Sequence, residues 1–228
     1  MPKVLLTISL LLFWGCTNHT ELSIHSQVKN VHSISSSEGQ DLFQTIDQEL
    51  YLKTKKYWQA QRKNYCGVCS LTIAGNTLNQ NNHIDQDNFF DNMVAEEVIL
   101  PATVAKMGMT LRELHEATVR RLVNIKVAKH YAHISGLDLF RLQLKNLNTD
   151  TQLIVNFSRQ SLKGEGMRSG HFSLATAYDA KSRKVLILEV QSSRESFWVQ
   201  DKDLYNAMLA VDPVSKIPRG WLLLNKEK

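Results

Sequence analysis

The clearest helical pattern lies in the middle of the chain. Thr110 and Glu113 have the spacing of a capping box, in which each side chain hydrogen-bonds the backbone N–H of the other residue. Leucines then recur on or near one face, as in a helix that packs against a core. Similar patterns occur further along, and the predicted helices cover residues 110–122, 137–147 and 203–211.

Short runs rich in β-branched and apolar residues mark the second half of the chain as strands. Residues 179–183 form a short polar connection between two of these runs, as in a hairpin. Helices followed by a mostly antiparallel sheet predict an α+β fold within one domain. The predicted strands are 152–157 (QLIVNF), 171–178 (HFSLATAY), 184–190 (KVLILEV) and 219–224 (RGWLLL).

Composition narrows the class of protein. The chain has 228 residues, of which 43% are hydrophobic and 21% charged, as in an ordinary globular domain. Its 3 cysteines exclude a disulfide scaffold, so the fold must depend on its hydrophobic core. The net charge of +5 is spread along the chain without a basic block, and we expect no nucleic acid partner.

The N-terminus carries a predicted export signal. Lys3 precedes the apolar run Val4–Trp14, which suits a secretory signal and is too short to span a bilayer. Gly15–Cys16 follows, and a small residue before a cysteine resembles the bacterial lipoprotein signal. We expect residues 1–15 to be a signal peptide and Cys16 to be lipidated, with ordinary secretory cleavage as the alternative. The protein is then exported, and is periplasmic or lipid-anchored to a bacterial membrane.

Residues 16–38 are rich in Ser, Thr, Asn and His and have no sustained apolar face, which predicts a flexible tether before a domain over 39–228. The histidines in this tether are a weak metal signal. His130 and His133 lie in what looks like a strand, where side chains three residues apart point to opposite faces. We therefore expect no metal site in the protein itself.

A candidate catalytic set begins at Cys66. The apolar pattern after it predicts a helix that starts near this cysteine, and the positive end of a helix stabilises a thiolate, the reactive form. His171 heads a predicted strand, and Glu189 lies near the end of the next strand, where its carboxylate can accept a hydrogen bond from the imidazole. The order Cys, His, orienting acid is that of papain-like enzymes. Taken singly, each residue also suits an ordinary structural position: a small core cysteine, a Gly-His turn, a polar strand position.

Several segments together carry a family resemblance. In chain order they are Tyr57–Gln61 (YWQAQ), Tyr65–Ser70 (YCGVCS), Gly170–Ser173 (GHFS), Leu186–Val190 (LILEV), Phe197–Val199 (FWV), and Asp212 with Arg219–Gly220. Over roughly residues 38 to 225 the chain resembles the catalytic domain of phytochelatin synthase. That likeness implies a papain-like fold and cleavage of the Cys-Gly bond of glutathione.

The resemblance implies roles for single residues. Cys66 is then the nucleophile and His171 the general base and acid, while Glu189 stands where the family normally has Asp. Gln61 is expected to supply the oxyanion-hole side chain. The thioester formed on the enzyme gives γ-glutamylcysteine by hydrolysis and, more slowly, phytochelatins by transpeptidation. No cofactor is required, and Cd²⁺ or Zn²⁺ enters as a thiolate complex of the substrate.

The γ-glutamyl moiety needs its own binding groups. The resemblance implies that Asp212 holds its α-amino group and Arg219 its α-carboxylate, and an anion and a guanidinium are the groups that such a head requires. Without the resemblance, the same two residues are more typical of a surface ion pair around a turn. We also assign Asn156 and Gly170 to substrate binding. The sequence leaves open whether the chain forms a homodimer.

Departures from the family pattern keep other functions open. Glu189 is longer than Asp by one methylene, which can tilt the imidazole, and the segment Gln191–Ser196 is shorter than its counterpart and lacks proline. Cys69 makes a C-x-x-C motif with Cys66, and a disulfide between the two would switch the nucleophile off. The alternatives are a papain-like peptidase for another peptide, and a thiol redox or metal-handling lipoprotein.

Overall fold

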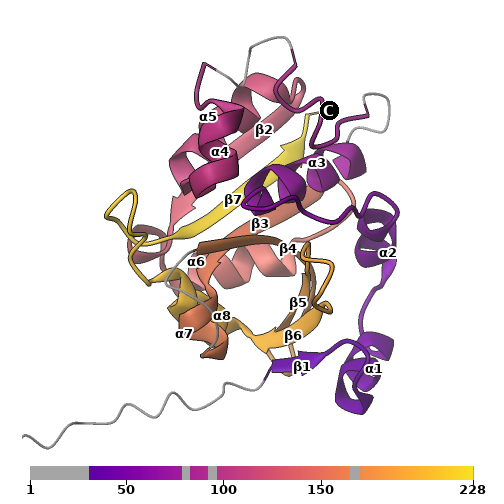
Figure 1. Cartoon of the computed structure of the whole chain (residues 1–228). Coiled ribbons are helices and arrows are strands. Elements are labelled where there is room, and N and C mark those ends of the chain that lie inside the picture. The colour runs from indigo at the N-terminus through magenta and orange to yellow at the C-terminus, as the bar shows by residue number, and fades with distance from the viewer. Residues whose placement is uncertain (1–30, 79–82, 92–96, 165–169, 228) are drawn as a thin grey trace, which may run out of the picture.

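One antiparallel sheet organises the computed structural model, which describes residues 31–78, 83–91, 97–164 and 170–227 (Figure 1). The strand order is β1-β6-β5-β4-β3-β7-β2, and every neighbouring pair is antiparallel. The α+β prediction is therefore confirmed. The strands are β1 (Val31–Ser33), β2 (Ile125–Tyr131), β3 (Thr151–Ser158), β4 (Gly170–Asp179), β5 (Lys184–Leu188), β6 (Phe197–Gln200) and β7 (Gly220–Lys226).

Helices cover both faces of the sheet (Figure 1). Helix α3 packs on one face against β3 and β4, and α6 and α8 pack on the other. The helices are α1 (Ser37–Gln44), α2 (Glu49–Lys55), α3 (Cys66–Leu78), α4 (Pro101–Met107), α5 (Leu111–Arg121), α6 (Ala132–Lys145), α7 (Arg159–Lys163) and α8 (Asp201–Met208).

Strand β3 shows why the strands of this sheet have continuous apolar sequences. Leu153, Val155 and Phe157 belong to the core beneath α6 and α8, whereas Ile154 belongs to the core beneath α3. Successive side chains of a strand point to opposite faces, so a strand buried on both sides needs apolar residues at every position. Asn156 breaks this run near the end of β3, where the candidate active site lies.

The predicted elements are largely present. The capping box of α5 is formed, because Thr110 Oγ1 accepts the Glu113 N–H at 3.2 Å and Glu113 accepts the Thr110 N–H at 2.8 Å. The predicted helix 137–147 is the part of α6 that follows a break at Gly136, whose φ of 80° is outside the helical region. Strand β5 ends before the predicted residue 190, because the Val190 and Gln191 N–H groups bond the Glu189 carboxylate instead of a neighbouring strand.

Helix α8 lies earlier in the chain than the predicted 203–211. It ends at Met208 because the carbonyls of Ala210 and Val211 accept hydrogen bonds from Arg219 instead of continuing the helix. Strand β2 ends at Tyr131, opposite the first residue of β7, so the expected strand through His133 is wrong and His133 lies in α6.

The predicted tether is wrong over residues 31–38. Val31–Ser33 pairs with β6 and completes one edge of the sheet, and Ser36 caps α1 by accepting the Gly39 N–H at 3.1 Å. The polar composition of this segment does not predict an ordered structure, and the backbone hydrogen bonds to β6 are what order it. The predicted signal peptide, Cys16 and the tether up to residue 30 lie outside the described residues. Within the described ranges, no helix has the length and apolar character needed to cross a bilayer.

Candidate active site

Cys66 is the first residue of α3, as predicted. The Tyr65 carbonyl accepts the Cys69 N–H at 2.8 Å, which begins the helical hydrogen-bonding pattern. The rest of the helix is buried, so its direction is fixed by the core, while the half-buried Cys66 faces a cleft. Cys66 therefore lies where the helix dipole and the free N–H groups of the first turn favour a thiolate.

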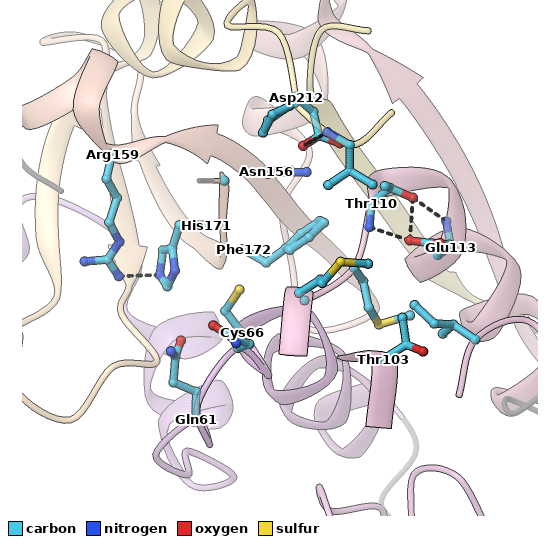
Figure 2. Close-up of a pocket in the computed structure, with 18 of the residues that line it drawn as sticks. Gln61, Cys66, Thr103, Thr110, Glu113, Asn156, Arg159, His171, Phe172 and Asp212 are labelled. Atoms are coloured by element: carbon cyan, nitrogen blue, oxygen red, sulfur yellow. Dashed lines mark hydrogen bonds between the residues drawn. The ribbon is translucent and has the colours of Figure 1, made fainter. Parts of the chain in front are cut away.

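Cys66 and His171 lie side by side in the cleft. His171 is the second residue of β4 and only 4% exposed, and Figure 2 shows it beside Cys66. Burial by itself raises the pKa of the Cys66 thiol, but His171 and the Phe172 and Gly67 amides outweigh burial and lower that pKa. Burial likewise lowers the pKa of His171, and its bonds to Cys66 and Glu189 reverse this and raise it. Both shifts favour a thiolate–imidazolium pair.

Glu189 lies directly after β5 and makes the predicted contact with His171. Its Oε1 is 2.7 Å from His171 Nε2, which leaves Nδ1 of the ring for the thiol. Although burial opposes ionisation, His171, Arg159 and the Gln191 amide lower the Glu189 pKa to about 2. The carboxylate is therefore ionised near neutral pH and can stabilise a protonated imidazole.

The extra methylene of Glu189 is accommodated by the backbone. The side chain folds back so that Oε1 also accepts the N–H groups of Val190 at 2.9 Å and Gln191 at 3.0 Å. The carboxylate thus reaches His171 at an ordinary hydrogen-bond distance, and the larger residue does not break the contact.

Arg159 is a residue of this site that the sequence reasoning missed. It begins α7 directly after β3, and its Nη2 bonds Glu189 Oε2 at 2.9 Å. The same nitrogen is 2.7 Å from His171 Nε2. Because a guanidinium only donates, Nε2 accepts from Arg159 when it carries no proton and donates to Glu189 when it does. A charged residue at the end of an apolar strand was the available signal, but the sequence does not show which strand lies beside it.

Gln61 lies beside Cys66, as the oxyanion-hole prediction requires (Figure 2). Its backbone N–H donates to the Val190 carbonyl at 2.8 Å, and Trp58 Nε1 donates to the Glu189 carbonyl at 2.8 Å. Two hydrogen bonds therefore fix the loop before α3 to the segment that carries the acid. The first-turn amides of α3 are further donors at the same place.

Asp212 and Asn156 line the cleft on the side of His171 opposite to Arg159 (Figure 2). Arg219 is buried, with 1% exposure, and its Nη1 donates to the carbonyls of Ala210 at 2.7 Å and Val211 at 3.0 Å. Its Nη2 is 3.9 Å from Asp212 Oδ1. A surface ion pair is therefore excluded, and Arg219 supports the wall of the cleft from behind.

Gly170 lies against the side chains of Arg219 and Asn156. A Cβ on Gly170 would lie 2.7 Å from Arg219 Nε and 2.9 Å from Asn156 Oδ1, so only glycine leaves the space between them open. Asn156 Oδ1 is buried and makes no hydrogen bond to any residue that the structure describes. A buried acceptor of this kind is costly unless a ligand or water satisfies it. Asn156, Gly170 and Asp212 thus line one part of the cleft, whereas Arg219 does not line it and lies buried against Gly170.

The cleft has a volume of about 350 Å³ and extends past Cys66 to a wall that the sequence reasoning did not identify. Helices α4 and α5, the turn between them and the residue Ile99 before α4 form this wall, with the Phe172 ring beside it (Figure 2). The residues are Ile99, Thr103, Met107, Met109, Thr110 and Glu113.

Cys69 does not line the cleft. Its side chain is fully buried and its thiol donates to the Gln59 carbonyl at 3.3 Å. Burial and the charges of Cys66 and Glu189 raise the pKa of Cys69 far above its usual value. Cys66 and Cys69 are both free thiols in the structure.

No group of three or more potential His, Cys, Asp or Glu metal ligands occurs among the described residues. His130 stacks on Trp221 at 5.2 Å and contacts Ser135 and Gln143, whereas His133 is exposed on α6. The two histidines therefore have separate surroundings.

Comparisons with known proteins agree on a family. The family model described as phytochelatin synthase matches residues 24–221. Glutathione gamma-glutamylcysteinyltransferase 3 of Lotus japonicus is 28% identical over 85% of this chain and 42% of its own length. Glutathione gamma-glutamylcysteinyltransferase of Schizosaccharomyces pombe is 25% identical over 86% of this chain and 49% of its own length. The chain thus spans under half the length of these curated relatives.

A solved structure is also similar. The peptidase domain of Streptococcus ComA, a bi-functional ABC transporter involved in a quorum sensing pathway, matches with a TM-score of 0.47 and 12% identity. The match covers 74% of this chain and 97% of that domain. The family assignment rests on the family model, which matches most of the chain including Cys66, His171 and Glu189. The chain belongs to the phytochelatin synthase family.

Proposed function

We propose that the protein is a cysteine-dependent acyltransferase that cleaves the Cys-Gly bond of glutathione through a thioester on Cys66. One observation carries the proposal: a thiol at a helix N-terminus lies beside a buried imidazole, which in turn contacts an ionised carboxylate. That arrangement is the one that acyl transfer by cysteine requires. Membership of the family and the names of the two relatives support glutathione as the substrate.

Acylation follows from the geometry. The Cys66 thiolate attacks the carbonyl carbon of the Cys-Gly bond, and the oxyanion accepts hydrogen bonds from the Gln61 amide and the first-turn amides of α3. His171 then gives its proton to the nitrogen of the departing glycine. Glu189 and Arg159 act as positioning residues, since Glu189 fixes the ring and stabilises the imidazolium while Arg159 holds the carboxylate.

Deacylation uses the same groups. His171 takes a proton from water, which attacks the thioester and releases γ-glutamylcysteine. Alternatively the α-amine of a second glutathione attacks, and the product is a phytochelatin. The ratio of hydrolysis to transfer depends on how well the cleft excludes water from the thioester.

The γ-glutamyl head of the substrate binds where the structure gathers Asp212, Asn156 and Gly170. Asp212 takes the ammonium group, Asn156 Oδ1 gains the donor that it lacks, and Arg219 attracts the carboxylate from behind Gly170. We further propose that Cd²⁺ or Zn²⁺ enters as a thiolate complex of glutathione.

Export is also part of the proposal. The N-terminal sequence supports a signal peptide with Cys16 lipidated after cleavage. Fractionation of cells that express the full chain tests this: the protein is expected in membranes, and the Cys16→Ser variant in the soluble exported fraction. Wild-type protein in the soluble fraction would contradict the lipid anchor.

Mass spectrometry tests the central step. The reduced full-length protein is incubated with glutathione, and the expected result is an adduct of γ-glutamylcysteine mass on the Cys66 peptide with release of glycine. Cys66→Ala should form no adduct, and Cys69→Ser, the matched thiol control, should still form it. No adduct and no glycine, with or without Cd²⁺, would overturn the proposal.

Asp212→Asn separates glutathione chemistry from general peptidase activity. The variant should lose most of its glutathione cleavage, since one charge of the head group is unpaired. If the protein were a peptidase for another substrate, Asp212→Asn would cleave that peptide as fast as wild type.

A further inference from the structure

The proposed acyl transfer uses the thiol of Cys66 and leaves that of Cys69 without a role. Cys69 lies one turn after Cys66 on the same helix α3, and both are free thiols. The Cys69 side chain is fully buried, and its thiol donates to the Gln59 carbonyl at 3.3 Å. Because burial keeps dissolved reagents away from Cys69, a reagent in the cleft reaches this thiol through Cys66.

The helix holds the two cysteines at a separation that a disulfide can bridge. The Cys69 N–H donates to the Tyr65 carbonyl at 2.8 Å, so the turn that contains both cysteines is helical. Cα atoms three residues apart in an α-helix are about 5 Å apart, and disulfides join Cα atoms that are about 4.4 to 6.8 Å apart. Cys66 is the first residue of α3, so its side chain can turn toward Cys69 without disturbing an earlier helical turn.

The acidities of the two thiols suit the two steps of thiol–disulfide exchange. Although burial opposes ionisation, His171 and two neighbouring amides lower the pKa of the Cys66 thiol, so Cys66 makes the first attack. Burial and the charge of the Cys66 thiolate raise the pKa of Cys69 far above its usual value. A mixed disulfide on Cys66 removes that thiolate charge, which makes Cys69 easier to ionise for the second attack.

We propose that Cys66 and Cys69 form a redox pair that exchanges with glutathione disulfide, and that the resulting Cys66–Cys69 disulfide reversibly turns acyl transfer off. Formation of this disulfide needs only the two thiols, whereas the loss of acyl transfer rests on the proposed function. The disulfide removes the nucleophile itself and draws its sulfur away from His171, beside which Cys66 lies in the reduced protein (Figure 2).

Glutathione disulfide is the oxidant that fits the proposed substrate site. Each half of it carries the same γ-glutamyl head as glutathione, and one head binds beside Asp212 and Asn156. Its sulfur is separated by two carbons from the carbonyl that reacts in acyl transfer, so the Cys66 thiolate meets either atom. The second half follows the cleft past Cys66 toward the wall formed by α4 and α5.

Two exchanges account for every atom. The Cys66 thiolate attacks one sulfur of glutathione disulfide, a Cys66–glutathione S–S bond forms, and the first glutathione leaves and takes the proton of the His171 imidazolium. Cys69 then attacks the Cys66 sulfur, the protein disulfide forms, and the second glutathione leaves with the proton that Cys69 gives up. The dithiol loses two electrons, and these reduce one glutathione disulfide to two molecules of glutathione.

Peptide mass spectrometry tests the pair. The chain has 3 cysteines, so full-length Cys16→Ser serves as the parent protein in which Cys66 and Cys69 are the remaining thiols. The parent is incubated with glutathione disulfide and then digested with trypsin, which leaves both cysteines on the peptide of residues 64–106. This peptide should lose the mass of two hydrogens and resist alkylation by iodoacetamide until dithiothreitol is added.

Activity should follow the state of the thiols. After treatment with glutathione disulfide, the initial rate of glycine release from glutathione should fall at least about tenfold, because the attacking thiolate is absent. Dithiothreitol should restore the rate of the untreated parent.

Variants assign a step to each cysteine. In the parent, a further Cys69→Ser change should leave one glutathione attached to Cys66, because no thiol resolves the mixed disulfide. Cys69→Ala is a second variant with the same expected adduct. Cys66→Ala should stay unmodified, because Cys69 is buried, and a glutathione adduct on Cys69 in this variant would contradict the order of attack.

The outcomes separate the two proposals. If the treated parent keeps two free thiols or a lasting glutathione adduct, the redox pair is overturned, and glycine release by the reduced protein still supports the proposed function. If the disulfide forms but the reduced protein releases no glycine from glutathione, the proposed function is overturned and the disulfide exchange stands. A treated parent that contains the disulfide and keeps its full initial rate overturns the switch.

Discussion

Glu189→Gln changes one atom in the most strongly charged part of the site. The Glu189 pKa is about 2 in the folded protein, against a usual value of 4.5. A pKa shift of one unit corresponds to about 1.4 kcal/mol, so ionisation of Glu189 contributes on the order of 3 kcal/mol to folding at pH 7. Because the folded-state pKa is the lower one, this contribution is fully present above about pH 5 and is lost as the pH falls toward 2.

The magnitude can be measured by urea unfolding. Wild type should be more stable than Glu189→Gln by about 3 kcal/mol at pH 7, and the difference should fall to less than about half by pH 3. Taking the difference between two proteins removes the titration of every other carboxylate. This difference already includes the loss of the Arg159 ion pair, because Arg159 is one of the groups that lower the Glu189 pKa.

Activity should fall with stability in the same variant. A neutral amide does not stabilise the His171 imidazolium, so thioester formation should slow by roughly 10² to 10⁴. Glu116→Gln, at an exposed residue of α5, is the control and should match wild type in both measurements. A stability difference that stays constant from pH 7 to pH 3 would refute the reasoning, since it would mean that Glu189 is not an ionised, strongly stabilised carboxylate.

Three further predictions test the site. Because the pKa of the Cys66 thiol is lowered chiefly by His171, alkylation by iodoacetamide should stay fast well below pH 8 and lose this low-pH rate in His171→Ala; the same pH profile in both proteins would contradict the ion pair. Gly170→Ala places a Cβ 2.7 Å from Arg219 Nε, so KM for glutathione should rise at least about tenfold while the circular dichroism spectrum is unchanged. Cys69→Ser keeps a hydroxyl donor for the Gln59 carbonyl and should form the thioester within a few-fold of the wild-type rate; its complete loss would favour a C-x-x-C redox protein.

The sequence alone was sufficient to predict those helices and strands whose signal is local or periodic. The Thr110–Glu113 capping box predicted the start of α5 because both partners lie within one turn. Runs rich in β-branched and apolar residues predicted β3, β4 and β7, since a strand buried on both faces needs apolar residues at most positions. The helix at Cys66 and the order of Cys66, His171 and Glu189 also follow from the chain itself, and the family resemblance adds their roles.

Contacts between distant segments needed the tertiary structure. The register of β3 against β4 pairs Ser158 with Gly170, and this places Arg159 at the imidazole. No pattern along the chain encodes that register, so Arg159 had no visible partner. The polar segment before α1 became a strand only because the edge of β6 offered backbone hydrogen bonds.

Burial decided the remaining questions. Asp212 and Arg219 suited a surface turn by sequence, yet Arg219 is buried behind Gly170 and supports the cleft. The longer side chain of Glu189 can tilt the imidazole, but here it folds back onto the Val190 amide and keeps the contact with His171. Chemical groups and local propensities are properties of the chain, whereas distance, solvent exclusion and pKa arise only when the sheet brings remote residues together.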